Sequence, residues 1–192
     1  IRNSKSEIVN LDSIQELREK MEENFSNKTE EVFSALGGSA SGGKNLSSEQ
    51  RLRTVIIASI LEKEAKTKED MELVAGIIKK RLELGMLLQI DASVAYGWCL
   101  KEAAISGFKR YCDVTQAPIA LEIKIDGPYN TYIRKGLPVG PISNPGLKAL
   151  RAALSPRGSD YLYYLSTRDG GQMIYSKTPA EHAANRRRHL GL

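Results

Sequence analysis

The stretch IIASILEKEAK, residues 56–66, decides how this sequence is interpreted, because it combines a strongly apolar helix with two glutamates. A helix advances about 100° per residue, so Ile56, Ile60 and Glu64 fall in one sector, and Glu62 points to roughly the opposite side. A carboxyl group held against apolar side chains has a raised pKa, which suits a general acid for glycosidic bond cleavage near neutral pH. The alternative is that Glu64 is simply the solvated end of its helix.

The residues around this stretch predict where two helices begin and end. Ser47, followed three residues later by Gln50, indicates a capping box that starts the Glu64 helix. Thr67 with Asp70 indicates the start of a second helix, which we expect to end at Gly85. A turn directly after Glu64 would leave its carboxyl group at the open rim of a cleft.

The C-terminal part of the sequence predicts a β-hairpin and a closing helix. Tyr161–Ser166 and Gln172–Tyr175 are rich in strand-forming residues, and the turn sequence RDGG at 168–171 separates them. The sequence TPAE at 178–181 combines an N-cap, a proline at the first helical position and a capping glutamate, so a helix should run to about His189. Helices together with a few antiparallel strands indicate an α+β fold.

Composition limits the class of protein. The chain has 192 residues, of which 41% are hydrophobic and 27% charged, and it has no apolar run near the about 18 residues that span a bilayer. Its net charge is +5, partly from Arg186–Arg188, which we interpret as a solvated helix face. Nucleic acid is not expected as a partner, because no zinc-finger or RNP-type motif is present. Cys99 and Cys112 lack metal-ligand spacing, their pairing stays open, and no metal or cofactor is expected.

Four segments, taken in order, resemble one enzyme family. They are IIASILEKE (56–64), KKRLELGMLLQIDASVAYG (79–97), GPYNTYIRKGLPVGPISNPG (127–146) and DYLYYLSTRDGGQMIYSKTPAEH (160–182). Together they are similar to the catalytic domain of the endolytic murein transglycosylases, the YceG-like family. The resemblance implies a lysozyme-like helical catalytic core with a small antiparallel β element.

The resemblance also implies a domain organisation. We expect 1–36 to be an N-terminal helical segment of the catalytic domain, with helical periodicity at Leu11–Phe33. Residues 37–46 contain GGSASGG and should be a flexible Gly/Ser linker, either a mobile loop or, as its composition favours, an engineered replacement. Residues 47–192 would form the YceG-like catalytic domain. The chain starts with Ile-Arg-Asn and has no signal-type segment, so we expect a fragment of a longer protein.

The resemblance implies a mechanism with one carboxyl group. In a lytic transglycosylase, a glutamate protonates the oxygen of the MurNAc-GlcNAc glycosidic bond and then takes the proton from the C6 hydroxyl of the same muramic sugar. A 1,6-anhydro ring closes without water. The matching residue here is Glu64. Two alternatives stay open: a retaining muramidase-type hydrolase with Asp91 as nucleophile, or a catalytically silent peptidoglycan-binding module.

Candidate substrate-binding residues follow from two of the segments. Gln89 and Asp91 could hydrogen-bond sugar hydroxyls or an N-acetyl group, although Asp91 could equally be the N-cap of a segment through Tyr96. Relatives usually read LQ-x-D-P-T-V, and this chain has Ala92 and Ser93 instead, which keeps a hydroxyl and removes a proline.

The second set comes from GPYNTY and the loop after it. Tyrosines can stack on sugar faces and asparagine can pair with an acetamido group, although the tyrosines could instead fill the core. Asn144 lies in a Gly- and Pro-rich loop expected beside the cleft, where it could also cap a helix that starts near Pro145. His182 occupies a position that recurs in the family, and we expect a structural role for it. The candidates in this set are Tyr129, Asn130, Thr131, Tyr132 and Asn144.

Relatives typically carry an N-terminal membrane anchor and a small LysM-like module before the catalytic part. The resemblance therefore implies the extracytoplasmic face of the bacterial inner membrane as location, with membrane contact only through an anchor that this chain lacks. Peptidoglycan glycan strands are the expected partner, with peptidoglycan synthases as further candidates.

Overall fold

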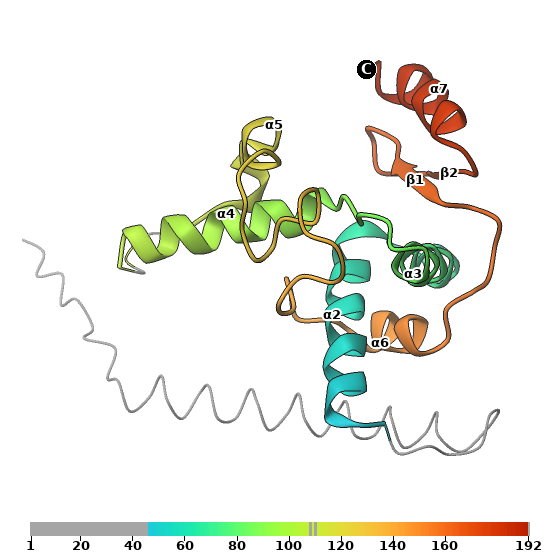
Figure 1. The fold of residues 1–192 in the computed structure, drawn as a ribbon. Helices are drawn as coiled ribbons and strands as arrows, with labels where there is room; N and C mark the ends of the chain where they lie inside the picture. Colours follow the sequence, from blue (N-terminus) through green and yellow to red (C-terminus); the bar gives the residue numbers. More distant parts are fainter. Residues whose placement is uncertain (1–45, 108, 110, 192) are drawn as a thin grey trace, which may run out of the picture. The chain divides into compact units, whose positions relative to one another are not determined.

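The structure, a computed structural model, describes residues 46–107, 109 and 111–191. The expected helix at Leu11–Phe33 and the Gly/Ser sequence at 37–43 lie outside these residues. The described part contains six α-helices and one antiparallel hairpin, so it is mostly helical (Figure 1). None of its helices is both long and apolar enough to cross a membrane. The elements are α2 (Ser48–Glu64), α3 (Lys68–Glu83), α4 (Asp91–Ile105), the 3-10 helix η1 (Val114–Gln116), α5 (Ile119–Glu122), α6 (Leu147–Leu154), β1 (Tyr163–Ser166), β2 (Met173–Ser176) and α7 (Pro179–Leu190).

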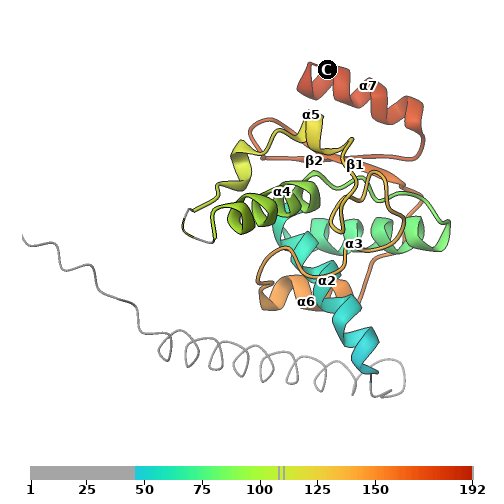
Figure 2. The same cartoon turned by 60° about the vertical axis from the view of Figure 1, so that its left-hand side comes forward.

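The core lies where α2, α3 and α6 pack against one another (Figure 2). Ile60, Ile77 and Ala149, one from each helix, are completely buried. Close packing also governs a glycine on α3: a Cβ atom at Gly76 would stand 1.9 Å from the carbonyl oxygen of Arg157. The apolar sector of α2 therefore faces the core, as its spacing predicted.

The predicted helix starts are confirmed. The Ser47 side chain accepts from the Gln50 amide, and the Gln50 side chain accepts from the Ser47 amide, which completes the capping box. Thr67 caps α3 by accepting from the Asp70 amide. α3 ends at Glu83, slightly before the expected residue, and Gly85 follows in a left-handed conformation with φ +64°.

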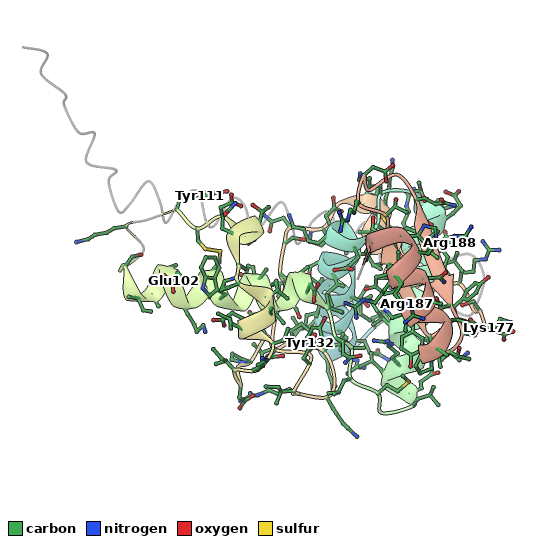
Figure 3. The ribbon with its side chains drawn as sticks, turned by 90° about the horizontal axis from the view of Figure 1, so that it is seen from above. Glu102, Tyr111, Tyr132, Lys177, Arg187 and Arg188 are labelled. Carbon is green, nitrogen blue, oxygen red and sulfur yellow. A yellow bond between two sulfur atoms is a disulfide. The ribbon has the colours of Figure 1, made fainter. Side chains whose placement is uncertain are left out.

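The alternative that Asp91 is the N-cap of a segment through Tyr96 is wrong, because Ile90 is the N-cap of α4, Asp91 is its first residue, and the helix continues to Ile105. Gly97 is a poor helix former, but it serves packing here, since a Cβ atom at this position would stand 2.9 Å from the Cβ of Tyr129. The open question of the cysteines is also answered: a disulfide joins Cys99 on α4 to Cys112 (Figure 3).

The Gly- and Pro-rich loop before α6 packs on α2. Ser59 accepts a hydrogen bond from the Ile142 amide at 2.9 Å. The predicted cap at Asn144 is wrong, because the N-cap of α6 is Gly146. A glycine offers no side-chain acceptor, and Glu62 replaces it by accepting from the Gly146 amide at 3.0 Å.

The predicted hairpin and final helix are confirmed, and hydrogen bonds attach the hairpin to α3. Tyr164 pairs with Tyr175 in the register of β1 and β2, and the Tyr175 hydroxyl donates to Asp70 at 2.6 Å. Arg81 of α3 donates to the carbonyl oxygen of Leu162, just before β1, at 2.7 Å. α7 begins at Pro179 with the expected N-cap and packs against both strands.

Candidate active site

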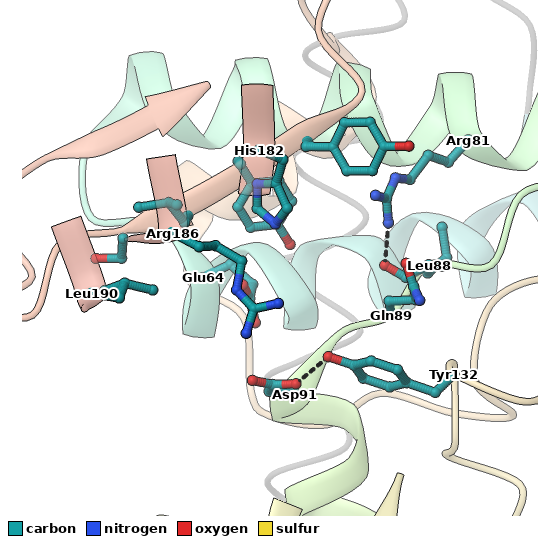
Figure 4. A pocket seen from close by; sticks show the side chains of 13 residues that line it. Glu64, Arg81, Leu88, Gln89, Asp91, Tyr132, His182, Arg186 and Leu190 are labelled. Carbon is teal, nitrogen blue, oxygen red and sulfur yellow. Dashed lines mark hydrogen bonds between the residues drawn. The ribbon is translucent and has the colours of Figure 1, made fainter. Parts of the chain in front are cut away.

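A polar pocket of about 420 Å³ lies where α2, α3, α4, the hairpin and α7 converge (Figure 4). This volume is within the range of about 300–1,000 Å³ that is usual for small-molecule sites. The walls combine two carboxyl groups with tyrosines, arginines and a histidine. The lining residues are Glu64, Arg81, Leu88, Gln89, Asp91, Tyr132, Tyr163, Tyr164, Leu165, Ser166, His182, Arg186 and Leu190.

Glu64 is the last residue of α2, and its half-buried side chain faces this pocket. The pKa of its carboxyl group is raised from 4.5 to about 7, mainly because burial disfavours the charged form. The Tyr164 hydroxyl donates a hydrogen bond to the carboxyl group, which lowers the pKa, and the negative charge of Asp91 raises it. The carboxyl group can therefore hold and release a proton near neutral pH.

Asp91 supplies the second carboxyl group of the pocket. It is the first residue of α4 and is exposed, and its Oδ1 atom accepts a hydrogen bond of 2.5 Å from the Tyr132 hydroxyl. Burial, together with this bond, raises the pKa of Tyr132, so the phenol stays a donor.

Three other predicted residues are buried next to Asp91 and Tyr132 in the sequence, and they form hydrogen bonds within the protein. Ser93, Asn130 and Thr131 are buried and do not line the pocket. The Thr131 hydroxyl accepts from the Ile90 amide at 2.9 Å and lies 3.0 Å from the Ser93 hydroxyl. Asn130 donates to two backbone carbonyls and accepts from the Tyr132 amide. Their polar groups are thus engaged by the protein itself, and their predicted contact with substrate stays a prediction.

Tyr129 and Asn144 also lie outside the polar pocket. Tyr129 packs edge-on against Tyr96, with ring centroids 5.0 Å apart, and lines a second, mostly apolar pocket along α4. Asn144 is exposed on the loop before α6. The structure therefore brings Gln89, Asp91 and Tyr132 together with Glu64 and leaves the other five candidates elsewhere.

Gln89 has an unusual backbone. Its φ of +53° places it in the left-handed region, and it is the one residue other than glycine with positive φ in the described part of the chain. Its amide donates to the Thr131 carbonyl at 3.0 Å. Such a conformation costs about 1 kcal/mol or more, and these costs are found mostly at functional sites.

Sequence reasoning missed the wall formed by the hairpin and α7. It overlooked Tyr164 within the hairpin, and it gave His182 only a structural role. Arg186 is exposed, as expected for a solvated helix face, but it also lines the pocket. Helical spacing held a signal, because His182, Arg186 and Leu190 recur every four residues and so share a face of α7. His182 stacks on Tyr163 with centroids 5.3 Å apart, and burial, followed by the charges of Arg186 and Arg81, lowers its pKa.

Arg81 connects the walls of the pocket. It is buried and donates to the carbonyl oxygens of Leu162, Leu87 and Leu88, and its guanidinium lies 4.8 Å from the centre of the Tyr163 ring. Its contacts hold the start of β1 and the segment before Gln89 against α3. Within the described ranges, no group of three His, Cys, Asp or Glu side chains is arranged to hold a metal ion.

Comparisons with known proteins agree with the resemblance in the sequence. Residues 6–188 match the model of the YceG-like family. The chain is 33% identical over 147 residues to an endolytic murein transglycosylase of Bacillus subtilis, covering 77% of this chain and 36% of that protein. It is 31% identical to one of Streptococcus pneumoniae, covering 70% of this chain and 23% of that protein. The chain thus spans about a third or less of the curated relatives that it matches.

A crystal structure gives a similar result. The fold matches that of a yceG-like protein from Listeria monocytogenes with a TM-score of 0.63 and 30% sequence identity, covering 91% of this chain and 48% of that one.

Proposed function

This chain belongs to the YceG-like family, and from that premise we propose that it cleaves the glycan strands of peptidoglycan as an endolytic lytic transglycosylase with Glu64 as its single general acid and base. The observation that carries the proposal is the position of Glu64 in a polar pocket, with a pKa of about 7. A carboxyl group with that pKa is present in both protonation states at neutral pH, and the two steps require one state each.

In the first step, protonated Glu64 gives its proton to the glycosidic oxygen, and the bond between that oxygen and C1 of the muramic sugar breaks. Positive charge develops at C1, and the negative charge of Asp91, which also acts on Glu64 in this pocket, stabilises it. In the second step, the C6 oxygen bonds to C1, and the Glu64 carboxylate takes the C6 hydroxyl proton. The Tyr164 hydroxyl donates to that carboxylate and favours its charged form between the steps.

A retaining hydrolase is the second candidate, because Asp91 is a carboxyl group in the same pocket as Glu64. As a nucleophile it would form a covalent glycosyl intermediate that water then releases. The hydrogen bond from Tyr132 favours the electrostatic role instead, since a carboxylate that accepts a strong hydrogen bond is a weaker nucleophile.

The proposal extends to the fold and the location. In lysozyme, the general acid is a glutamate whose pKa is raised by an apolar environment. Glu64 shares that property, and a lysozyme-like core is the fold that the family resemblance implies. The disulfide between Cys99 and Cys112 supports an extracytoplasmic location, because disulfides persist in oxidising compartments. Peptidoglycan strands would be the substrate, with peptidoglycan synthases as candidate partners.

Mass spectrometry of digested peptidoglycan tests the chemistry. We expect 1,6-anhydromuramyl ends from the protein, and a cleavage rate at least about a hundredfold lower for Glu64→Gln, because the amide keeps the volume but cannot transfer a proton. Glu62→Gln is the matched control and should keep most of the activity. Reducing ends would assign a hydrolase, and no cleavage would point to a binding module or to a truncation that disables the enzyme. Equal losses in the two variants would remove Glu64 from its role.

A further inference from the structure

The wall of the pocket formed by α7 presents one arginine to the interior. His182, Arg186 and Leu190 all line the pocket, and in Figure 4 the Arg186 side chain reaches from α7 toward Asp91 and Glu64. α7 is attached to the hairpin at its middle and at its C-terminal end: Asn185 donates to Ser176 at 3.0 Å, and Arg168 donates to the Leu190 carbonyl. The Arg186 guanidinium is thus carried by an anchored element.

The guanidinium group of Arg186 has no hydrogen-bond acceptor among the described residues. Within the described part of the chain, it forms no hydrogen bond or ion pair, and it acts on Tyr132 and His182 only through its charge. Arg81, the other arginine of the pocket, differs because it already donates to three carbonyl oxygens. Arg186 therefore has its donors available for a ligand in the pocket.

The chemistry of a guanidinium group identifies what it would bind. Its parallel N–H donors match the two oxygens of a carboxylate, and they also bind an acyl carbonyl. Both sugars of the proposed substrate carry a 2-acetamido carbonyl, so that group does not distinguish them. Only the muramic sugar carries a 3-O-lactyl group that ends in a carboxyl, which is free or linked to a peptide, and N-acetylglucosamine has no such group.

We propose that Arg186 binds the carboxyl-derived oxygens of this lactyl group and thereby selects muramic sugars for the subsite beside Glu64. This inference rests on the proposed function. The same helix provides matched controls, because Arg187 and Arg188 are exposed, as Arg186 is, but do not line the pocket (Figure 3).

Binding to an inactive protein tests the inference apart from catalysis. In the Glu64→Gln background, calorimetry would compare a muramyl-containing tetrasaccharide with free lactyl carboxylates against chitotetraose of equal length. We expect Arg186→Gln to weaken the muramyl ligand about tenfold, the scale of one hydrogen bond to a charged group, and to leave chitotetraose unchanged. Arg187→Gln should change neither. Equal weakening of both ligands, or no weakening, would overturn the inference.

Three further arms sharpen the result. A peptide-linked muramyl ligand separates two sources of the oxygens. If Arg186→Gln also weakens the binding of this ligand, Arg186 contacts the acyl carbonyl. If the variant weakens only the ligand with free lactyl carboxylates, Arg186 contacts the carboxylate. In active protein, Arg186→Gln should raise KM and keep the pH profile of kcat; a shifted profile with unchanged KM would mean that Arg186 only tunes Glu64 or Asp91. If the Glu64→Gln protein with intact Arg186 binds neither ligand, the proposed function fails and takes this inference with it.

Discussion

The two pockets to which α4 contributes residues differ in how they are assembled. The Glu64 pocket draws its walls from residue 64 to residue 190 and contains two carboxyl groups, two arginines and a histidine. The apolar pocket uses only residues 94–130, with Trp98 and Tyr129 among its walls, and a disulfide closes the segment beside it. A general acid needs a partly desolvated carboxyl group that faces other polar groups across a cavity. In this protein, segments that are distant in the sequence provide these groups. The local pocket is built by packing.

The largest difference should appear when the disulfide is removed. A loop closed over 13 residues contributes about 3 kcal/mol by restricting the unfolded chain. We expect Cys99→Ala with Cys112→Ala to lower the free energy of unfolding by about that amount in urea titrations, with the cleavage rate of the folded protein little changed. Reducing the parent protein should reproduce the loss. A strongly reduced cleavage rate with an unchanged free energy of unfolding would show that the disulfide beside the apolar pocket influences the Glu64 pocket.

The second prediction concerns the energetic cost of Glu64. Its carboxyl group holds a proton more tightly in the folded protein, with a pKa of about 7, than at its ordinary pKa of 4.5. As pH rises from 4.5 to 7, the unfolded chain loses the proton first, so the stability of the folded state falls; above about 7 it levels off. The full shift is worth about 3 kcal/mol, and partial solvent access reduces it to about 2 kcal/mol.

Glu64→Gln has no proton to lose and should therefore be more stable than the parent protein by about 2 kcal/mol at pH 8 and by little at pH 4.5. Thermal or urea unfolding across this pH range measures the difference. Glu62→Gln is the control, because it makes the same substitution at an exposed glutamate of the same helix, outside the polar pocket. Parallel curves for the parent and Glu64→Gln would contradict the raised pKa.

The sequence predicted the parts of the site that local chemistry determines. Helical spacing gave the side of α2 on which Glu64 lies, and capping residues gave the starts of α2, α3 and α7. It could not separate Tyr132, which faces the pocket, from Asn130 and Thr131, which are engaged behind it. That difference depends on contacts with α4 and the segment before it, which no local pattern encodes.

Long-range contacts account for the other omissions. Tyr164 reaches Glu64 only because Arg81 and Asp70 attach the hairpin to α3. α4 passes through Gly97, although glycine is a poor helix former, and Tyr129 packs against that glycine. Contacts between segments distant in the sequence thus outweighed the local helix propensity where the two disagreed.

The smallest expected effect concerns the backbone of Gln89. This residue gives the polar pocket a positive φ outside glycine, and the described walls of the apolar pocket have no such residue. Gln89→Gly removes the strain of φ +53° but adds freedom to the unfolded chain, so stability should change by less than about 1 kcal/mol. Gln89→Ala keeps the strain and removes the same side-chain amide. If that amide binds a sugar, both variants should raise KM equally in cleavage assays. A loss confined to the glycine variant would mean that the rigid backbone, and not the side chain, positions the substrate.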